Sequence, residues 1–149
     1  MTAAERLAAF RFRFPLTVRF RDLDAMGHVN NAVYLTYLES ARIAWWMHLT
    51  HGRDLRALTM ILARSEIDYR SPLAYAEELE VGVRCTGVRR SSVMVETVIG
   101  VTGAGPSRLA AEARQVLVHY DYASQSSRPL TEELRQQLLA QDPDLVIEV

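Results

Sequence analysis

Hydrophobic and polar positions along the chain predict a strand, then one long helix, then a series of strands. In residues 16–21, LTVRFR, apolar and polar side chains alternate, which is the period-two pattern of a half-buried strand. From about Ala32 to Thr50, apolar residues recur at spacings of three and four and share one helix face: Tyr34, Tyr37, Leu38, Ala41, Trp45 and His48. Other apolar residues lie off this face, so we expect the rest of the protein to enclose the helix.

From about residue 59 onward the pattern changes to strands. Residues 59–69 form one strand-like run, either bent or bulged. Residues 79–88 and 93–101 alternate on either side of a tight turn at RRSS. Residues 108–122 contain several alanines, which favour a helix. They follow a Gly/Pro loop and end in β-branched and aromatic residues, however, so we predict a strand.

A short amphipathic helix is expected near the end of the chain, at about residues 131–141. Thr131 is its predicted N-cap, and two glutamates stand in its first turn. No internal repeat or low-complexity linker interrupts the order of elements. The sequence therefore predicts one domain over residues 1–149, an α+β fold in which a mostly antiparallel sheet wraps around a single central helix.

Composition and charge narrow the class of protein. Hydrophobic residues make up 49% of the chain and charged residues 23%, which is the balance of a globular protein, and the net charge of -1 predicts no nucleic-acid binding. No apolar stretch is long enough to span a bilayer, and the first residues, MTAAERLAAFRFRF, lack the apolar core of a secretory signal, so we expect a cytoplasmic protein. The single cysteine, Cys85, excludes an internal disulfide and is expected to be a buried thiol on an apolar strand face.

The connection between the first strand and the long helix carries an unusual amount of polar chemistry: residues 21–34 read RDLDAMGHVNNAVY. Gly27 permits either a positive φ or close approach of a substrate to the backbone. Asn30 and Asn31 are both good N-cap candidates. The first amides of the helix have no intrahelical acceptor and carry the positive end of the helix dipole, so they can stabilise a developing oxyanion.

Residues 19–42, RFRDLDAMGHVNNAVYLTYLESAR, resemble the strand, D-x-D-x-x-G loop and helix entry of the hotdog-fold thioesterases, specifically the 4-hydroxybenzoyl-CoA thioesterase-like group of acyl-CoA hydrolases. A weaker likeness extends to IDYRSPLAYAEELEV and VHYDYASQSSRPLTEEL. The resemblance implies a hotdog fold with a five- or six-stranded sheet around the long helix. It also implies homodimers or tetramers with active sites at the dimer interface. The implied substrates are acyl-CoA or acyl-carrier-protein thioesters, and no metal or organic cofactor is implied.

The resemblance also implies roles for individual loop residues. Asp24 matches the catalytic aspartate, which acts as a nucleophile or as a general base on water; taken alone, it would be a turn or capping residue. Asn31 matches the position whose backbone N–H binds the oxyanion. Asp22 matches the first acid of the pattern, and we expect it to make local turn hydrogen bonds.

His28 departs from many members of this group, although HVNN is similar to the plant acyl-carrier-protein thioesterases and to some bacterial acyl-CoA thioesterases. It can orient Asp24, donate a hydrogen bond to the thioester carbonyl, or make a structural polar contact. A metal site is not expected, because no second ligand stands at a suitable spacing.

Further candidates for substrate binding lie outside the acidic part of the loop. Besides Gly27 and Asn30, Tyr34 is close enough to the helix entry to contact an acyl group while packing in the core. Glu39 is expected to pair with Arg42 rather than to act in catalysis. The candidates for the CoA phosphates are the turn residues Arg89, Arg90, Ser91 and Ser92, although arginines on a turn are also common as solvated residues.

Three functions follow from these observations. The leading hypothesis is an acyl-CoA thioesterase that uses Asp24 and the Asn31 amide. A hotdog hydratase or dehydratase is disfavoured, because residues 24–29 read DAMGHV and do not match the D-x-N-P-x-H pattern of those enzymes. The third possibility is a non-catalytic protein that binds acyl thioesters or assembles through the fold.

Overall fold

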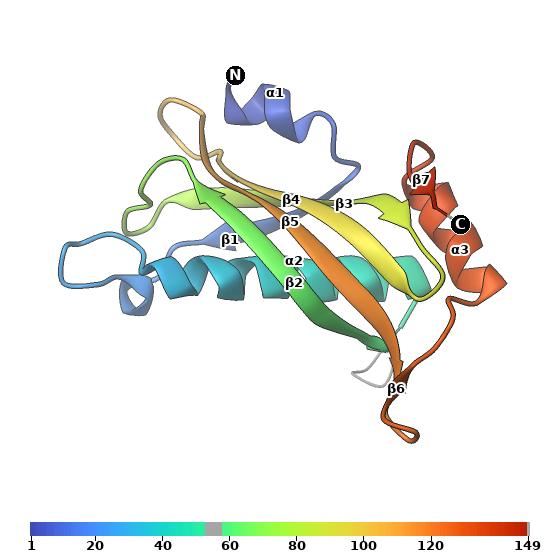
Figure 1. Cartoon of the computed structure of the whole chain (residues 1–149). Coiled ribbons are helices and arrows are strands. Elements are labelled where there is room, and N and C mark those ends of the chain that lie inside the picture. Colours follow the sequence, from blue (N-terminus) through green and yellow to red (C-terminus); the bar gives the residue numbers. More distant parts are fainter. Residues whose placement is uncertain (53–57, 149) are drawn as a thin grey trace.

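The long helix α2 (Asn31–Thr50) lies in the concave face of a curved sheet (Figure 1). This computed structural model describes residues 1–52 and 58–148. The remaining elements, in chain order, are α1 (Ala3–Leu7), β1 (Phe12–Thr17), the 3-10 helix η1 (Phe20–Asp22), β2 (Met60–Tyr69), β3 (Glu78–Val88), β4 (Ser92–Val101), β5 (Arg108–Asp121), β6 (Ser126–Ser127), α3 (Glu132–Gln141) and β7 (Val146–Ile147). None of the described helices is long and apolar enough to span a membrane.

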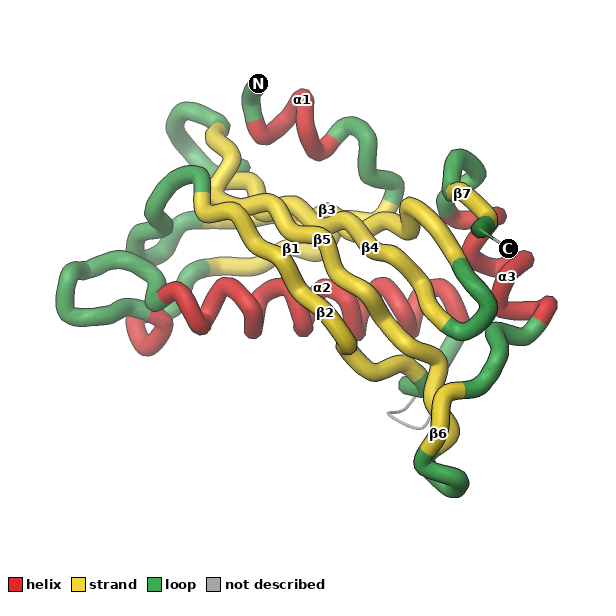
Figure 2. The backbone as a smooth tube through the Cα atoms, in the orientation of Figure 1, coloured by secondary structure: helices red, strands yellow, loops and turns green. Residues whose placement is uncertain are grey.

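The five long strands form one antiparallel sheet in the order β1-β3-β4-β5-β2 (Figure 2). Two short strands extend it, since β6 pairs with β5 and β7 pairs in parallel with the end of β3. β1 and β2 are the two outer strands of this order. The chain therefore passes from one edge of the sheet to the other between them, and α2 spans that distance. The predicted α+β architecture, with a sheet wrapped around one helix, is confirmed.

The main core lies between α2 and the concave face of the sheet. The predicted helix face is buried at Tyr34, Tyr37, Leu38, Ala41 and Trp45, where it packs against inward-facing strand residues such as Val81, Val95 and Leu117. His48, at the far end of this face, is exposed, and its ring lies tilted against that of Phe12 with centroids 5.4 Å apart. Phe12 is the first residue of the outer strand β1, so the sheet ends beside His48 and does not cover its ring.

Most of the predicted strands are confirmed, and one was misplaced. Of residues 16–21, only Leu16 and Thr17 lie in a strand: β1 ends at Thr17 and η1 follows at Phe20. The chain turns there because the carboxylate of Asp22 accepts a hydrogen bond from the backbone N–H of Arg19 (3.0 Å), which closes a single helical turn. The alternating strand pattern instead begins at Phe12, and Pro15 is tolerated because β1 is an outer strand.

The remaining elements follow the sequence pattern closely. The predicted bulge in β2 lies between Leu62 and Arg64, and the alanine-containing run is β5. Thr131 caps α3, with its hydroxyl accepting a hydrogen bond from the backbone N–H of Leu134 (3.1 Å). Cys85 is buried, as predicted, and burial raises the pKa of its thiol to about 12.

Residues 3–10, here called the N-terminal segment, lie across the convex face of the sheet and were not predicted from the sequence (Figure 1). Ala3, Leu7 and Phe10 form a second apolar cluster with Val98. The sheet makes room for them with glycines, since a Cβ on Gly82 would stand 2.7 Å from Cγ of Phe10. The segment therefore fits a surface shaped to receive it.

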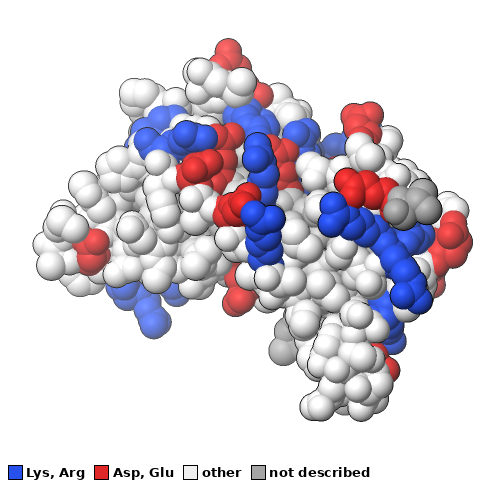
Figure 3. All heavy atoms as spheres, in the orientation of Figure 1, with Lys and Arg blue, Asp and Glu red and all other residues white. Residues whose placement is uncertain are grey.

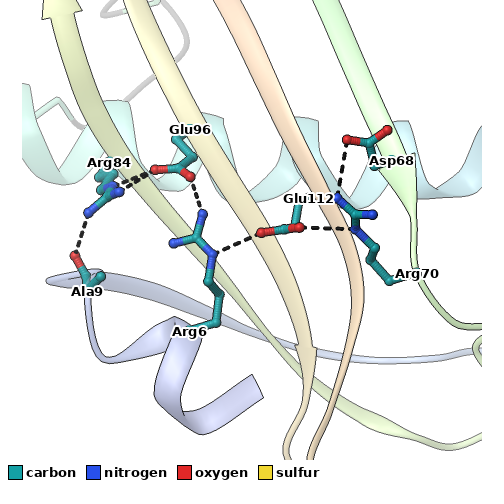
Figure 4. Close-up of polar contacts among 7 residues, drawn as sticks. All are labelled: Arg6, Ala9, Asp68, Arg70, Arg84, Glu96 and Glu112. Atoms are coloured by element: carbon teal, nitrogen blue, oxygen red, sulfur yellow. Dashed lines mark hydrogen bonds and ion pairs between the residues drawn. The ribbon is translucent and has the colours of Figure 1, made fainter. Parts of the chain in front are cut away.

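Ion pairs fix the same segment to the sheet (Figure 4). Arg6 of α1 pairs with Glu96 of β4 and, at 2.9 Å, with Glu112 of β5. The two glutamates also pair with Arg84 and Arg70, at 2.7 Å and 3.1 Å, so basic and acidic side chains alternate across this side of the molecule (Figures 3 and 4). Because these groups are partly buried, the pairs hold α1 in one register on the sheet.

Candidate active site

The polar loop between η1 and α2 is closed by its own backbone hydrogen bonds. Leu23 and Val29 form an isolated antiparallel bridge, and within it the N–H of Asp24 donates to the carbonyl of His28 (2.9 Å). The N–H of Gly27 donates back to the carbonyl of Asp24 (3.0 Å), and Gly27 has a φ of 79°. This value confirms the positive φ that was predicted as one option for Gly27. A side chain at this position would strain the backbone.

Asp24 lies beside a hollow of about 300 Å³, here called the Asp24 pocket, which is lined by Asp24, His28, Asn31, Tyr34, Tyr69 and Ser71 among others. The carboxylate of Asp24 is half-buried, and its Oδ1 accepts a hydrogen bond from the backbone N–H of Met26 (2.9 Å). Its Oδ2 has no hydrogen-bond partner within residues 1–52 and 58–148. One oxygen is thus held in place while the other is available to a ligand.

The start of α2 brings backbone donors to the same pocket. Asn30 is the N-cap: its side-chain oxygen accepts a hydrogen bond from the N–H of Ala32 (2.9 Å), as predicted for one of the two asparagines. Asn31 is the first residue of the helix and lines the pocket. In the described part of the chain its N–H has no acceptor. An unpaired amide at the positive end of a helix favours an anionic ligand.

Asp22, in contrast, is turned away from the pocket into the protein. Its carboxylate is buried and accepts hydrogen bonds from the hydroxyl of Tyr37 (2.6 Å) and from the guanidinium of Arg19 (2.9 Å). Burial acts to raise the pKa of Asp22, but the hydrogen bonds from Arg19 and Tyr37 outweigh it and lower the pKa below its usual range. The expected local hydrogen bonding of Asp22 is confirmed.

His28 is exposed at the rim of the Asp24 pocket. Its side chain makes no hydrogen bond or ion pair with another residue that the structure describes. The carboxylate of Asp24 is oriented by the amide of Met26 and not by His28. Among the described residues the side chain of His28 neither orients Asp24 nor makes a structural polar contact, and its hydrogen bond to the thioester carbonyl stays a prediction.

Tyr69, at the end of β2, is a pocket residue that sequence reasoning missed. Its hydroxyl donates to the carbonyl of Asn31 (3.2 Å), and its ring stands edge-on to that of Tyr34 at 5.0 Å. The hydroxyl of Tyr34 in turn donates to the carbonyl of Ser71 (3.3 Å). The two tyrosines tie the first turn of α2 to the end of β2. The only signal in the sequence was the segment IDYR at residues 67–70.

The turn between β3 and β4 carries Arg89, Arg90 and Ser92. Within a single chain these residues lie far from the Asp24 pocket. The pocket is lined by Tyr69 and Ser71 at the end of β2. Figure 1 shows that β2 ends at the same end of the sheet where β3 begins. Because β3 has 11 residues, the β3–β4 turn lies roughly 30 Å further along the sheet. At the turn, Arg89 pairs with Glu148 at 2.5 Å. The guanidinium of Arg135 donates to the carbonyl of Arg89 (3.0 Å).

Glu39 lies on α2 away from the Asp24 pocket, with its side chain 63% exposed. It forms an ion pair with Arg42 at 3.9 Å, as predicted. Arg42 also donates to the side-chain oxygen of Gln115 (3.2 Å). Glu39 therefore belongs to a polar contact between helix and sheet.

A family model described as thioesterase-like superfamily matches residues 18–138. The chain belongs to the thioesterase-like superfamily. One relative is the long-chain acyl-CoA thioesterase FadM of Escherichia coli K12, which is 29% identical over 128 residues that cover 83% of this chain and 93% of FadM. Another is YsmA of Bacillus subtilis, 29% identical over 93 residues, a match that spans 62% of this chain and only 63% of YsmA.

Solved structures of thioesterases share the fold. A thioesterase from Thermus thermophilus, crystallised with coenzyme A and zinc, is 37% identical and superposes with a TM-score of 0.80 over 91% of this chain and 97% of its own. The superfamily membership and this likeness confirm the hotdog fold that the sequence predicted. The residues of this chain that the structure describes contain no group of three or more potential metal ligands.

Proposed function

We propose that the protein hydrolyses acyl-CoA thioesters to a free acid and CoA. One observation carries the proposal: a carboxylate with one free oxygen, Asp24, and an unpaired helix N-terminal amide, Asn31, line the same pocket. Thioester hydrolysis needs these two groups, one to attack the carbonyl or activate water and one to bind the oxyanion. The relatives named for acyl-CoA hydrolysis and the neighbour crystallised with coenzyme A support this substrate class.

In the proposed reaction the thioester carbonyl lies between Asp24 and the N-terminus of α2. Either the Asp24 carboxylate attacks the carbonyl carbon, giving a mixed anhydride that water then hydrolyses, or it removes a proton from the water that attacks. In both routes the carbon–sulfur bond breaks and CoA leaves as a thiol. The Asn31 N–H stabilises the oxyanion that both routes share, and loss of one such donor costs about 3 kcal/mol of barrier.

The residues around these two groups bind the substrate. Gly27 lets the substrate approach the loop backbone, Asn30 holds the helix N-terminus in place, and Tyr34 contacts the acyl group at the helix entry. His28, exposed at the rim, donates a hydrogen bond to the bound thioester. None of these side chains competes with Asp24 for the attacking role.

The CoA phosphates are bound by Arg89, Arg90 and Ser92 in this proposal. Because these residues lie far from Asp24 within one chain, the proposal requires self-association, so that the turn of one copy meets the loop of another. The long outer strand β2 supplies a suitable surface, since among the described strands it pairs with β5 alone and most of its residues are exposed.

The test is thiol release from a panel of aliphatic and aromatic acyl-CoA substrates by the wild type and by Asp24→Asn. We expect the substitution to lower kcat by roughly 10²–10⁴-fold while the thermal unfolding transition is retained. The matched control is Asp121→Asn, because Oδ1 of Asp121 accepts a hydrogen bond from the N–H two residues on (3.0 Å), as Oδ1 of Asp24 does. Unchanged turnover in Asp24→Asn would refute the assignment. Acyl-CoA binding without hydrolysis by the wild type would favour a non-catalytic binding protein.

A further inference from the structure

Asp22 is a buried carboxylate outside the Asp24 pocket, and both of its oxygens accept hydrogen bonds. Its Oδ2 accepts hydrogen bonds from the Tyr37 hydroxyl (2.6 Å) and the Arg19 backbone N–H (3.0 Å), and its Oδ1 accepts one from the Arg19 guanidinium (2.9 Å). The residue is only 3% exposed. A buried charge without partners costs several kcal/mol, so these contacts strongly fix the position of Asp22.

The backbone of Asp22 closes the polar loop between η1 and α2. Its carbonyl accepts a hydrogen bond from the N–H of Asn30 (3.0 Å), and the Leu23–Val29 bridge lies directly inside this bond. Asp24 follows Asp22 by two residues on one side of the loop, and Asn31 follows Asn30 on the other. One anchored residue therefore determines where both proposed catalytic groups lie.

Tyr37 connects this anchor to the body of the helix. It lies about 9 Å further along the axis of α2 than Asn31, beyond the first turn, where helix ends fray most readily. Its side chain is buried in the main core. The hydrogen bond from Tyr37 to Asp22 therefore ties the loop to the second turn of α2.

We infer that Asp22, held by Tyr37 and Arg19, is a positioning residue for the thioesterase reaction, because it sets the distance between the Asp24 carboxylate and the Asn31 N–H. The inference rests on the proposed function, and neither Asp22 nor Tyr37 lines the Asp24 pocket. A displacement of about 1 Å between reacting groups can lower a rate by roughly 10²-fold. The effect is therefore expected in kcat and not in substrate binding.

The kinetic test compares Asp22→Asn and the milder Tyr37→Phe with the wild type. We expect kcat to fall by roughly 10- to 100-fold in Asp22→Asn and by less in Tyr37→Phe, while KM stays close to the wild-type value. Asp142→Asn is the matched control, since Asp142 is another buried carboxylate and accepts a hydrogen bond from the N–H of Cys85 (2.9 Å), far from the loop. It should lower the unfolding temperature and leave kcat unchanged.

A second measurement does not depend on activity. Hydrogen exchange of the backbone amides of Asp24 and Asn30, which donate to His28 and Asp22, should become faster in Asp22→Asn. Amides in the middle of β4 should exchange as in the wild type.

Wild-type kcat in Asp22→Asn would overturn the inference and leave the proposed function intact, because Asp24→Asn tests that function separately. If the wild type hydrolyses no acyl-CoA, the proposed function fails. In that case the amide exchange still tests whether Asp22 holds the loop in place. Faster exchange of the Asp24 and Asn30 amides in Asp22→Asn supports this, and unchanged exchange overturns it.

Discussion

Replacing Gly82 with alanine is expected to destabilise the protein, although the same change usually stabilises one. At a backbone conformation that alanine can adopt, glycine-to-alanine substitution adds roughly 0.4–1 kcal/mol of stability by restricting the unfolded chain. At Gly82, however, the new Cβ would stand 2.7 Å from Cγ and 2.9 Å from Cδ1 of Phe10. The sign of the effect therefore reports whether Phe10 occupies its place on the convex face.

The contact distances set the size of the effect. Carbon atoms in contact normally lie about 3.5–4.0 Å apart, so the ring must retreat by roughly 1 Å. Overpacking of this kind costs about 1–3 kcal/mol. The upper limit is the loss of the whole contact, because Phe10 is 2% exposed and burying such a side chain is worth about 1.5–3 kcal/mol. After subtraction of the gain in the unfolded state, we expect a net loss of roughly 1–2 kcal/mol.

Urea unfolding followed by the fluorescence of the buried Trp45 and Trp46 measures this loss. The set is wild type, Gly82→Ala, Phe10→Leu and the double variant. In the Phe10→Leu background the added methyl meets a smaller, more flexible side chain, so the second substitution should cost much less than in the wild type. If Gly82→Ala is instead more stable than the wild type by roughly 0.4–1 kcal/mol, Phe10 does not lie against Gly82 and the reasoning is refuted.

Two further predictions concern titratable groups. The pKa of Glu112 is lowered in the folded protein, chiefly by the hydrogen bond from Arg6. Glu112 therefore stabilises the fold at pH values above the ordinary glutamate pKa of about 4.3. This stabilisation is lost as the pH falls through the lowered pKa of the folded protein. Stability curves at decreasing pH should therefore fall more steeply for the wild type than for Glu112→Gln, and parallel curves would contradict this. Burial raises the pKa of Cys85 to about 12, so its thiol should react with iodoacetamide at neutral pH only at the rate at which the protein opens, and rapid labelling of the folded protein would contradict its placement.

Local pattern was sufficient to predict the long elements of the fold. The three-four spacing from Tyr34 to Trp45 located α2, and the aromatic and β-branched end of residues 108–122 outweighed the alanines of β5. The position of β1 was wrong by four residues, because the alternation continues past Thr17 although the carboxylate of Asp22 turns the chain there. Such a side-chain contact has no signature in hydrophobic spacing.

The candidate site was predictable where its residues are contiguous and not where they are distant. Asp24 and Asn31, which line the pocket, come from one short loop, and the pattern of that loop predicted both as site residues. Tyr69 joins them from the end of β2 through a single hydrogen bond to Asn31, which only the folded chain reveals. The structural use of Asp22 was expected, but its link to Tyr37 depends on how α2 packs against the loop.

The placement of α1 has a consequence for the order in which the chain folds during synthesis. Arg6 pairs with Glu112, 106 residues later in the chain, and the N–H of Ala4 donates to Ser107, 103 residues later. At synthesis rates of about 5–20 residues per second, the N-terminal segment leaves the ribosome roughly 5–20 s before β5 exists to receive it. Ala3, Leu7 and Phe10 cannot reach their final places on the completed sheet during that interval, so this segment is made before the sheet but is among the last parts to be placed.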